Sequence, residues 1–115
     1  MNLDNLKQLG RMEEEKEIIP GIVVKLHTLS SEEQDELAAF APTNEEIIKN
    51  YPKIQRKCLV ISTTSLTLGG ETISSKEDLE KAYSAMQYKL LNKAYGFYLD
   101  LGNKQNDTVE TLKKN

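Results

Sequence analysis

Hydrophobic and polar positions alternate through residues 22–29 in a pattern that predicts a strand. The β-branched and leucine side chains of this segment take turns with Lys25 and His27. Because successive side chains of a strand point to opposite faces, one face of the segment is apolar and the other is polar. The alternation therefore predicts a strand of a half-exposed sheet, with His27 on the solvated face beside Lys25.

A hairpin is predicted farther along the chain. Residues 62–68 are rich in threonine and end in an alternation of leucine with threonine, which favours a strand. Gly69-Gly70 is a turn signal, and residues 71–73 are placed to pair back on the preceding strand. The apolar run at residues 54–61 is too short for its periodicity to distinguish a helix from a strand, so both remain open.

Two short helices are predicted between these strands. The first begins at one of two overlapping capping boxes within residues 30–34 (SSEEQ) and ends before Pro42. The second covers residues 45–51, is capped by Asn44 and ends or bends at Pro52.

The strongest helical pattern lies at residues 76–101. Capping-box sequences at residues 74–78 precede it, and Gly102 and Asn103 are typical residues at which a helix stops. Apolar side chains recur in steps of four and three residues, which predicts one long helix packed on the sheet. The side chains of this stripe are Leu79, Tyr83, Met86, Leu90, Ala94, Phe97 and Leu101.

Together these elements predict an α+β fold, in which a small antiparallel sheet is packed by one long C-terminal helix and two short helices. We expect a single domain at residues 18–102. Residues 1–17, in which Leu3, Leu6 and Leu9 precede an acidic run, are predicted to form a weakly ordered amphipathic helix. Residues 103–115 are mostly polar and are predicted to form a flexible tail.

Length and charge narrow the function classes. The chain has 115 residues, the size of one small domain. It contains 15 Lys and Arg against 18 Asp and Glu, a net charge of −3. Residues 1–50 hold five basic and eleven acidic side chains, whereas residues 51–115 hold ten basic and seven acidic ones. An acidic protein lacks the long-range attraction that non-specific nucleic-acid binding requires, so the composition does not favour a nucleic-acid partner.

The sequence offers little chemistry for catalysis. Cys58 is the single cysteine and lies in an apolar run, and His27 is the single histidine. We expect a buried thiol and a solvated imidazole rather than a catalytic pair. The acidic clusters have the spacing of helix caps and not of a metal site. We therefore predict no enzyme activity, no cofactor and no metal. The chain shows neither a secretory pattern nor an apolar membrane span, so we expect a reduced, soluble, cytoplasmic protein.

Two groups of residues are candidates for binding. Tyr88, Leu91, Tyr95 and Tyr98 widen the apolar face of the long helix beyond what a small sheet needs, and we predict that they form a surface for another protein. Lys53, Arg56 and Lys57 form a basic cluster near Tyr51, which could stack a base. Three charges with one aromatic residue are a weak nucleic-acid signal, and a solvated or acid-paired face is favoured.

Three segments within residues 20–100 carry a family resemblance. The first is the extended run GIVVKLHTL at residues 21–29, followed by SSEE. The second is the basic and apolar run IQRKCLVIS at residues 54–62, with the GGE turn after it. The third is the capped helix that runs from SKEDL to LLNKAY at residues 75–95. In this order the segments resemble the small tail assembly chaperones and baseplate-hub assembly proteins of tailed bacteriophages.

The resemblance implies a protein without catalysis or cofactor that holds another tail or hub protein during virion assembly, or that remains as a small structural subunit. Its partner would be a tail, tape-measure or baseplate-hub component, and self-association is compatible with the same role. Its location would be the host cytoplasm or the virion. The alternative is a small cytoplasmic adaptor or regulatory domain that binds a different protein.

Overall fold

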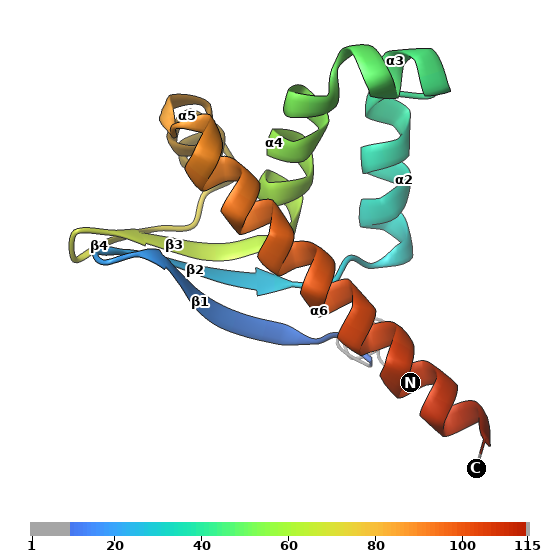
Figure 1. Cartoon of the computed structure of the whole chain (residues 1–115). Helices are drawn as coiled ribbons and strands as arrows, with labels where there is room; N and C mark the ends of the chain where they lie inside the picture. Colours follow the sequence, from blue (N-terminus) through green and yellow to red (C-terminus); the bar gives the residue numbers. More distant parts are fainter. Residues whose placement is uncertain (1–9, 115) are drawn as a thin grey trace.

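The computed structural model describes the backbone of residues 10–114 and the side chains of residues 10–106. The chain has an α+β fold with a four-stranded antiparallel sheet of order β1-β2-β3-β4, as the sequence predicts (Figure 1). The strands are β1 (Glu13–Ile19), β2 (Ile22–His27), β3 (Thr63–Leu68) and β4 (Glu71–Ile73). The helices are α2 (Ser31–Phe40), α3 (Asn44–Lys49), α4 (Tyr51–Ser62), α5 (Lys76–Ala85) and α6 (Tyr88–Lys114).

Tight turns join the strands into two hairpins. Gly21 has φ +92° in the turn between β1 and β2. Gly69 and Gly70 have φ +56° and +91°, a backbone that side-chain-bearing residues rarely adopt. The hairpin predicted at Gly69-Gly70 is therefore confirmed, and Leu68 pairs with Glu71 across it.

Helices α4, α5 and α6 cover one face of the sheet (Figure 1). The opposite face is polar: Lys25 Nζ lies 3.2 Å from Glu13 Oε1, and the Thr67 and Thr72 hydroxyls are 3.0 Å apart. Alternation along the strands thus gives the sheet one face that is buried under the helices and one that is exposed to solvent. The buried cluster between sheet and helices consists of Ile18, Val24, Leu26, Leu59, Val60, Leu66, Leu79, Tyr83, Leu91, Ala94 and Leu101.

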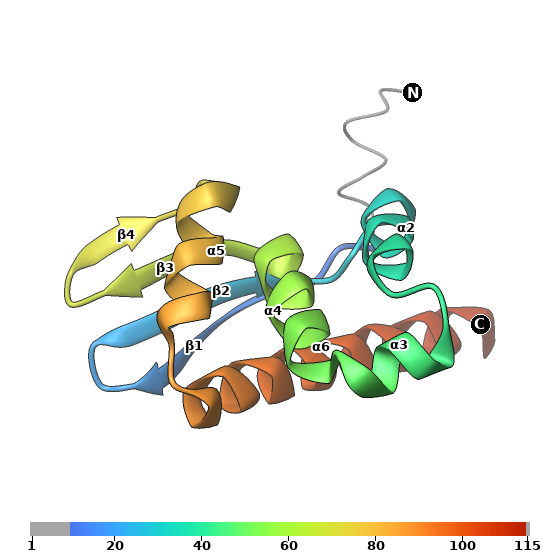
Figure 2. The same ribbon diagram turned by 90° about the horizontal axis from the view of Figure 1, so that it is seen from above.

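The predicted long helix over residues 76–101 is two helices, so that prediction is wrong in its continuity. Met86 has an extended backbone (ψ 139°) and separates α5 from α6. Figure 2 shows that the break lets α5 lie beside α4 while α6 runs along β1 and β2. The predicted apolar stripe still faces the core, because Leu79, Tyr83, Ala94 and Leu101 are all buried.

Helix α6 does not stop at Gly102 and Asn103 but continues to Lys114. Gly102 lacks the positive φ of a helix-terminating glycine. Gln105 secures the following turn, because its Nε2 donates to the Gly10 carbonyl at 2.8 Å and to Thr28 Oγ1 at 3.0 Å. Residues 103–114 of the predicted flexible tail are the last part of α6.

The N-terminal prediction is also corrected. Residues 13–17, predicted to end an amphipathic helix, belong to the edge strand β1 instead. Cations from two other elements hold this acidic strand: Lys104 Nζ of α6 lies 2.6 Å from Glu14 Oε1, and Lys25 of the neighbouring strand β2 reaches Glu13. The predicted helical segment at residues 1–9 lies outside the described residues.

Helices α3 and α4 show how the remaining predictions for residues 44–61 stand. Residues 54–61, left open between helix and strand, belong to α4. Pro52 stands in the first turn of α4, where proline costs no hydrogen bond, and so it begins a helix rather than ending one. Thr43, and not Asn44, caps α3, because its side chain accepts a hydrogen bond from the Glu46 amide.

His27 is buried, so the prediction of a solvated strand histidine is wrong. The register of β2 against β3 shifts between Lys25 and Leu26, which interrupts the simple alternation. His27 ends the strand beside the first turn of α2, where its Nε2 lies 4.0 Å from Glu33 Oε2 and its Nδ1 lies 3.0 Å from the Thr28 carbonyl. The neighbouring helix thus covers a side chain that the strand pattern alone would leave in solvent.

Candidate protein-binding surface

Helices α2 and α3 form an arm that stands off the sheet (Figures 1 and 2). Neither helix contains a buried residue. Local signals define both: Ser30 and Glu33 form a complete capping box at the start of α2, and Thr43 caps α3. Most helices in folded proteins draw their stability from burying an apolar face, and this arm does not.

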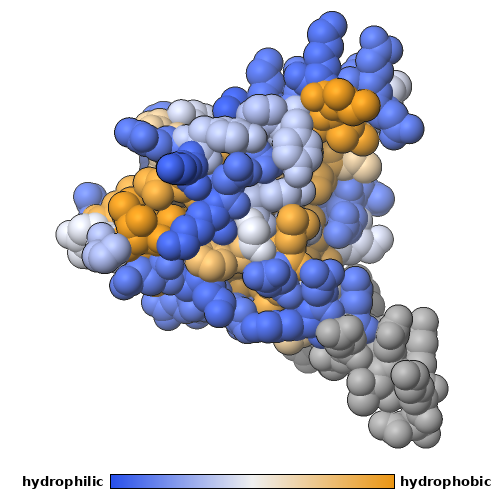
Figure 3. All heavy atoms as spheres, in the orientation of Figure 1, coloured by the Kyte–Doolittle hydropathy of each residue, from blue (hydrophilic) through white to orange (hydrophobic). Residues whose placement is uncertain are grey.

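The arm nevertheless carries large apolar side chains in solvent. Phe40 is 46% exposed, Ile47 is 40% exposed and Ile48 is 80% exposed. Hydrophobic atoms gather over α3 at the upper right of Figure 3, next to polar atoms. We call Phe40, Ile47 and Ile48 the arm apolar residues. Isolated exposed apolar side chains are ordinary, but three within one short arm mark a surface that another molecule can cover.

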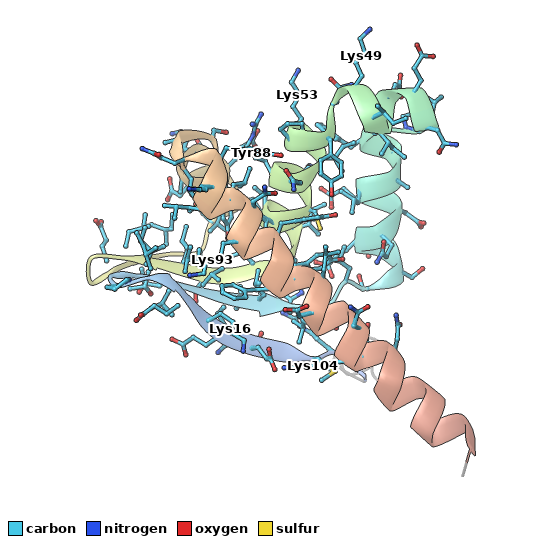
Figure 4. The ribbon with its side chains drawn as sticks, viewed as in Figure 1. Lys16, Lys49, Lys53, Tyr88, Lys93 and Lys104 are labelled. Atoms are coloured by element: carbon cyan, nitrogen blue, oxygen red, sulfur yellow. The ribbon has the colours of Figure 1, made fainter. Side chains whose placement is uncertain are left out.

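The arm is acidic as well as apolar. Its one described cation is Lys49, which Figure 4 shows pointing away from the sheet. Lys57 of α4 tethers the arm, with its Nζ 3.2 Å from Glu36 Oε1. Charged side chains of one sign thus surround the exposed apolar residues of the arm. The acidic residues are Glu32, Glu33, Asp35, Glu36, Glu45 and Glu46.

The four predicted partner-binding residues do not share one environment. Leu91 is buried in the core, so it adds nothing to the exposed surface. Tyr88 is 50% exposed at the start of α6 (Figure 4). Tyr95 and Tyr98 are half-buried and pack against the core cluster. A protein-binding role for Tyr88, Tyr95 and Tyr98 stays a prediction, and Tyr88 is the member that a partner reaches most directly.

Tyr95 and Tyr98 belong to an aromatic cluster that joins α4 to α6. The Tyr51 ring stands edge-on to Tyr95, with ring centres 6.2 Å apart, and the Tyr95 and Tyr98 rings are 6.0 Å apart. Burial, followed by the nearby Cys58 and Tyr51, raises the pKa of Tyr95 to about 12. Tyr51, which we considered as a stacking residue for a base, is engaged in this cluster.

Cys58 is a buried structural thiol, as predicted. Burial raises its pKa to about 12, and a hydrogen bond with Tyr98 opposes that rise only in part. A thiol whose pKa lies so far above neutral pH stays protonated and is a poor nucleophile. The Cys58 thiol forms its hydrogen bond with Tyr98, whereas the His27 ring contacts Thr28 and Glu33.

The basic cluster predicted on α4 lines a groove between α2, α4 and α5. The groove has a volume of about 250 Å³. Phe40 and Val60 supply apolar surface, and Glu80 and Ser84 of α5 form the opposite side. The cations that line it are Lys53, Arg56 and Lys57. We call this feature the basic groove.

Sequence reasoning did not single out Phe40, Ile47 or Ile48 as exposed residues. One signal was present: the apolar residues at 37–41 (LAAFA) are consecutive, so they cover more of the helix circumference than one buried stripe does. Consecutive apolar residues place side chains around the helix, so some of them must face solvent.

Among residues 10–106, no group of three or more His, Cys, Asp or Glu side chains is arranged to hold a metal ion. None of the described helices combines the length and the hydropathy that crossing a lipid bilayer would need. Comparison with models of known protein families, with curated proteins and with solved structures finds no match.

Proposed function

We propose that the chain is a non-enzymatic protein-binding factor and that its partner covers the arm apolar residues. The observation that carries this proposal is the arm itself, two helices without one buried residue that expose Phe40, Ile47 and Ile48. Burying apolar side chains is the main favourable term in protein association, so an uncovered apolar arm gains most from a protein partner.

The size of the surface fits a modest interface. Burying one large aliphatic or aromatic side chain contributes about 1.5–3 kcal/mol, so three such residues form a plausible energetic centre for binding. The acidic side chains around them form a polar rim. Tyr88 lies apart from the arm on α6 and would extend the contact only for a larger partner (Figure 4).

The resemblance of the segment order to phage tail assembly chaperones and baseplate-hub assembly proteins suggests the class of partner. We propose a tail, tape-measure or baseplate-hub component, held during virion assembly or bound permanently in the particle. An uncovered arm and a net charge of −3 support this role, because a chaperone needs an apolar surface for its client and charge for its own solubility.

The test is capture of a partner by the tagged full chain in cells that also make the products of its neighbouring genes. The eluate is analysed by mass spectrometry and light scattering. Recovery of a tail or hub protein in a defined ratio supports the proposal. Recovery of a different protein in a defined ratio favours the adaptor alternative, and a monomer that retains nothing at low and high salt contradicts the proposal.

Two variants ask whether the arm makes the contact. Ile47→Asp and Ile48→Asp introduce charge on the arm and should abolish capture, with the melting temperature nearly unchanged because neither side chain is buried. Leu99→Asp on α6 is the matched control, since Leu99 is 47% exposed and lies far along the chain from the arm. Equal loss of capture in all three variants would show that the arm has no special role.

A further inference from the structure

The basic groove has a composition that the apolar arm alone does not explain. It brings together the end of α2, residues 53–60 of α4 and residues 80–84 of α5, and Figure 2 shows α4 beside α5. Its volume of about 250 Å³ lies below the roughly 300–1,000 Å³ of usual small-molecule sites. A space of this size accepts one or two side chains of a peptide more readily than a cofactor.

The groove presents cations that are free to bind. Among residues 10–106, no carboxylate oxygen lies within 4.0 Å of the charged nitrogen atoms of Lys53 or Arg56. Lys57 differs, because Glu36 already neutralises it at 3.2 Å. Lys53 points away from the sheet in Figure 4, at the outer end of α4. An acceptor group entering the groove would therefore meet Arg56 and Lys53 first.

One wall of the groove is apolar. Phe40, which is 46% exposed in all, lines this wall, and Val60, which is buried in the core, forms the apolar floor beneath it. A simple anion would gain nothing from these two side chains. A ligand that carries both a carboxylate and an apolar side chain uses both walls, and a planar guanidinium such as that of Arg56 binds carboxylates through two parallel hydrogen bonds.

We infer that the basic groove binds an acidic segment of the partner protein, with a carboxylate held by Arg56 and Lys53 and a neighbouring apolar side chain packed on Phe40. This inference rests on the proposed protein-binding function and assigns the chemistry of one part of the contact. Phe40 belongs both to the arm apolar residues and to the groove, so one partner segment can run from the arm into the groove.

Nucleic acid fits the groove less well. A polynucleotide needs an extended track of cations, because its affinity comes from many phosphates. Here three cations line a short groove, Glu80 lines it with them, and Glu36 and the acidic arm border it. These carboxylates would repel a long polyanion but leave room for a single carboxylate.

The test is fluorescence anisotropy with the full chain and short fluorescein-labelled peptides. The probe peptide alternates leucine with aspartate, and its matched control alternates leucine with asparagine. We expect the aspartate peptide to bind and the asparagine peptide to bind at least about tenfold more weakly, because a charge-assisted hydrogen bond contributes that much. Affinity for the aspartate peptide should fall as salt screens the charges.

Variants assign the binding to the groove. Arg56→Gln should lower the affinity for the aspartate peptide about tenfold. Lys57→Gln should lower it less, because Lys57 already forms an ion pair with Glu36. Glu80→Gln should strengthen binding about threefold by removing a like charge, a gain that loss of folding cannot produce. Lys89→Gln, which removes an exposed cation outside the groove, should leave the affinity unchanged.

Several outcomes would overturn the inference. These are no binding of the aspartate peptide, equal binding of both peptides, or an equal loss of affinity for the aspartate peptide in Arg56→Gln and Lys89→Gln. Tighter binding of a labelled oligothymidine, lost in Arg56→Gln, would assign the groove to nucleic acid instead. Competition by inorganic phosphate as effective as that of the unlabelled peptide would reduce it to a simple anion site.

The partner-capture experiment separates this inference from the proposed function. If wild type and Arg56→Gln recover the same partner equally, the inference about the groove fails and the protein-binding function stands. If wild type recovers no partner, the proposed function fails whichever peptide the groove binds.

Discussion

Helices α2 and α4 are close in length but are stabilised by different interactions. Helix α2 begins with a complete capping box and contains no buried residue. Helix α4 has no side-chain cap, yet Cys58, Leu59, Val60 and Ile61 are all buried within it. The difference shows two routes to a helix in one small protein, local hydrogen bonding at the ends in α2 and burial of an apolar face in α4.

The two routes have different consequences for function. A cap contributes about 1 kcal/mol, whereas burying a single large apolar side chain contributes about 1.5–3 kcal/mol. Helix α2 is therefore held weakly but keeps its apolar residues available. Helix α4 uses its apolar residues internally and presents its basic side to the groove. Stability and the proposed binding are thus concentrated in different elements.

The largest expected contrast lies between Leu59 and Ile48. Leu59 is fully buried in α4, and Leu59→Ala should lower the free energy of unfolding by about 3 kcal/mol, through lost transfer energy and a cavity. Ile48→Ala should change it by less than about 0.5 kcal/mol because the side chain is already in water. Urea denaturation measures both. A large loss in Ile48→Ala would mean that the arm is packed in solution.

A second contrast lies within the predicted tyrosine surface. Tyr98 packs against the core and Cys58, so Tyr98→Ser should cost about 2 kcal/mol of unfolding free energy. Tyr88→Ser should cost less than about 0.5 kcal/mol, since half of its side chain is exposed. Thermal denaturation of the two variants decides the point. Equal melting temperatures would restore Tyr98 to the binding surface.

Local signals in the sequence predicted much of the fold. The β2 strand, the Gly69-Gly70 hairpin and a helix cap within residues 74–78 were all predicted correctly, since each depends on a few neighbouring residues. Of the two serines that could cap the helix, the structure uses Ser75. The apolar stripe of residues 79–101 also predicted which side chains face the core. These features follow from side-chain spacing and backbone geometry, which a single sequence contains.

The errors arose where distant residues decide the structure. Glu13 to Glu17 is a poor strand by composition, but pairing with β2 and ion pairs from Lys25 and Lys104 stabilise it. The break at Met86 involves neither proline nor glycine and follows from packing α5 and α6 in different places. Nothing within a short window of sequence reveals either cause.

The candidate site was predicted only in part. Tyr88 is exposed as the prediction requires, but Leu91 is not, because the sequence shows which helix face is apolar and not how much of it the rest of the chain covers. The groove cations Lys53, Arg56 and Lys57 were recognised as a cluster. Their apolar wall was not, since Phe40 comes from a different helix that only the fold brings beside them.

A smaller contrast compares two serine caps with equal geometry. The Ser30 hydroxyl accepts from the Glu33 amide and the Ser75 hydroxyl from the Asp78 amide, both at 3.2 Å. Ser75→Ala should lower global stability by about 1 kcal/mol because α5 is part of the core. Ser30→Ala should barely change global unfolding but should speed amide exchange in α2 about fivefold, because that helix opens locally.

Hydrogen exchange followed by mass spectrometry, with urea denaturation alongside, separates the two effects. If Ser30→Ala reduced global stability as much as Ser75→Ala, the arm would unfold together with the core and the contrast between the two regions would fail. Thr43→Ala is a second test of the arm, since its hydroxyl caps α3 with the same 3.2 Å hydrogen bond.

The smallest expected effect concerns the acid sensitivity of the sheet's polar face. Burial alone would raise the pKa of Glu13, but the Thr64 hydrogen bond and the Lys25 and Arg11 charges hold it below its usual 4.5. A carboxyl group with a lowered folded-state pKa contributes stability above its unfolded pKa and loses that contribution as the pH falls through the folded value. Glu13→Gln should therefore lower stability at pH 7 and reduce the stability lost between about pH 5 and 3.

The size of this effect is limited by solvent, because a third of the Glu13 side chain is exposed. We expect less than about 0.5 kcal/mol at pH 7, or about 2 °C in melting temperature. A double-mutant cycle compares the melting temperatures of wild type, Glu13→Gln, Lys25→Gln and the double variant from pH 7 to pH 3. The coupling between Glu13 and Lys25 should vanish as Glu13 becomes protonated. Coupling that does not decline as the pH falls would show that packing, and not charge, links β1 to the rest of the sheet.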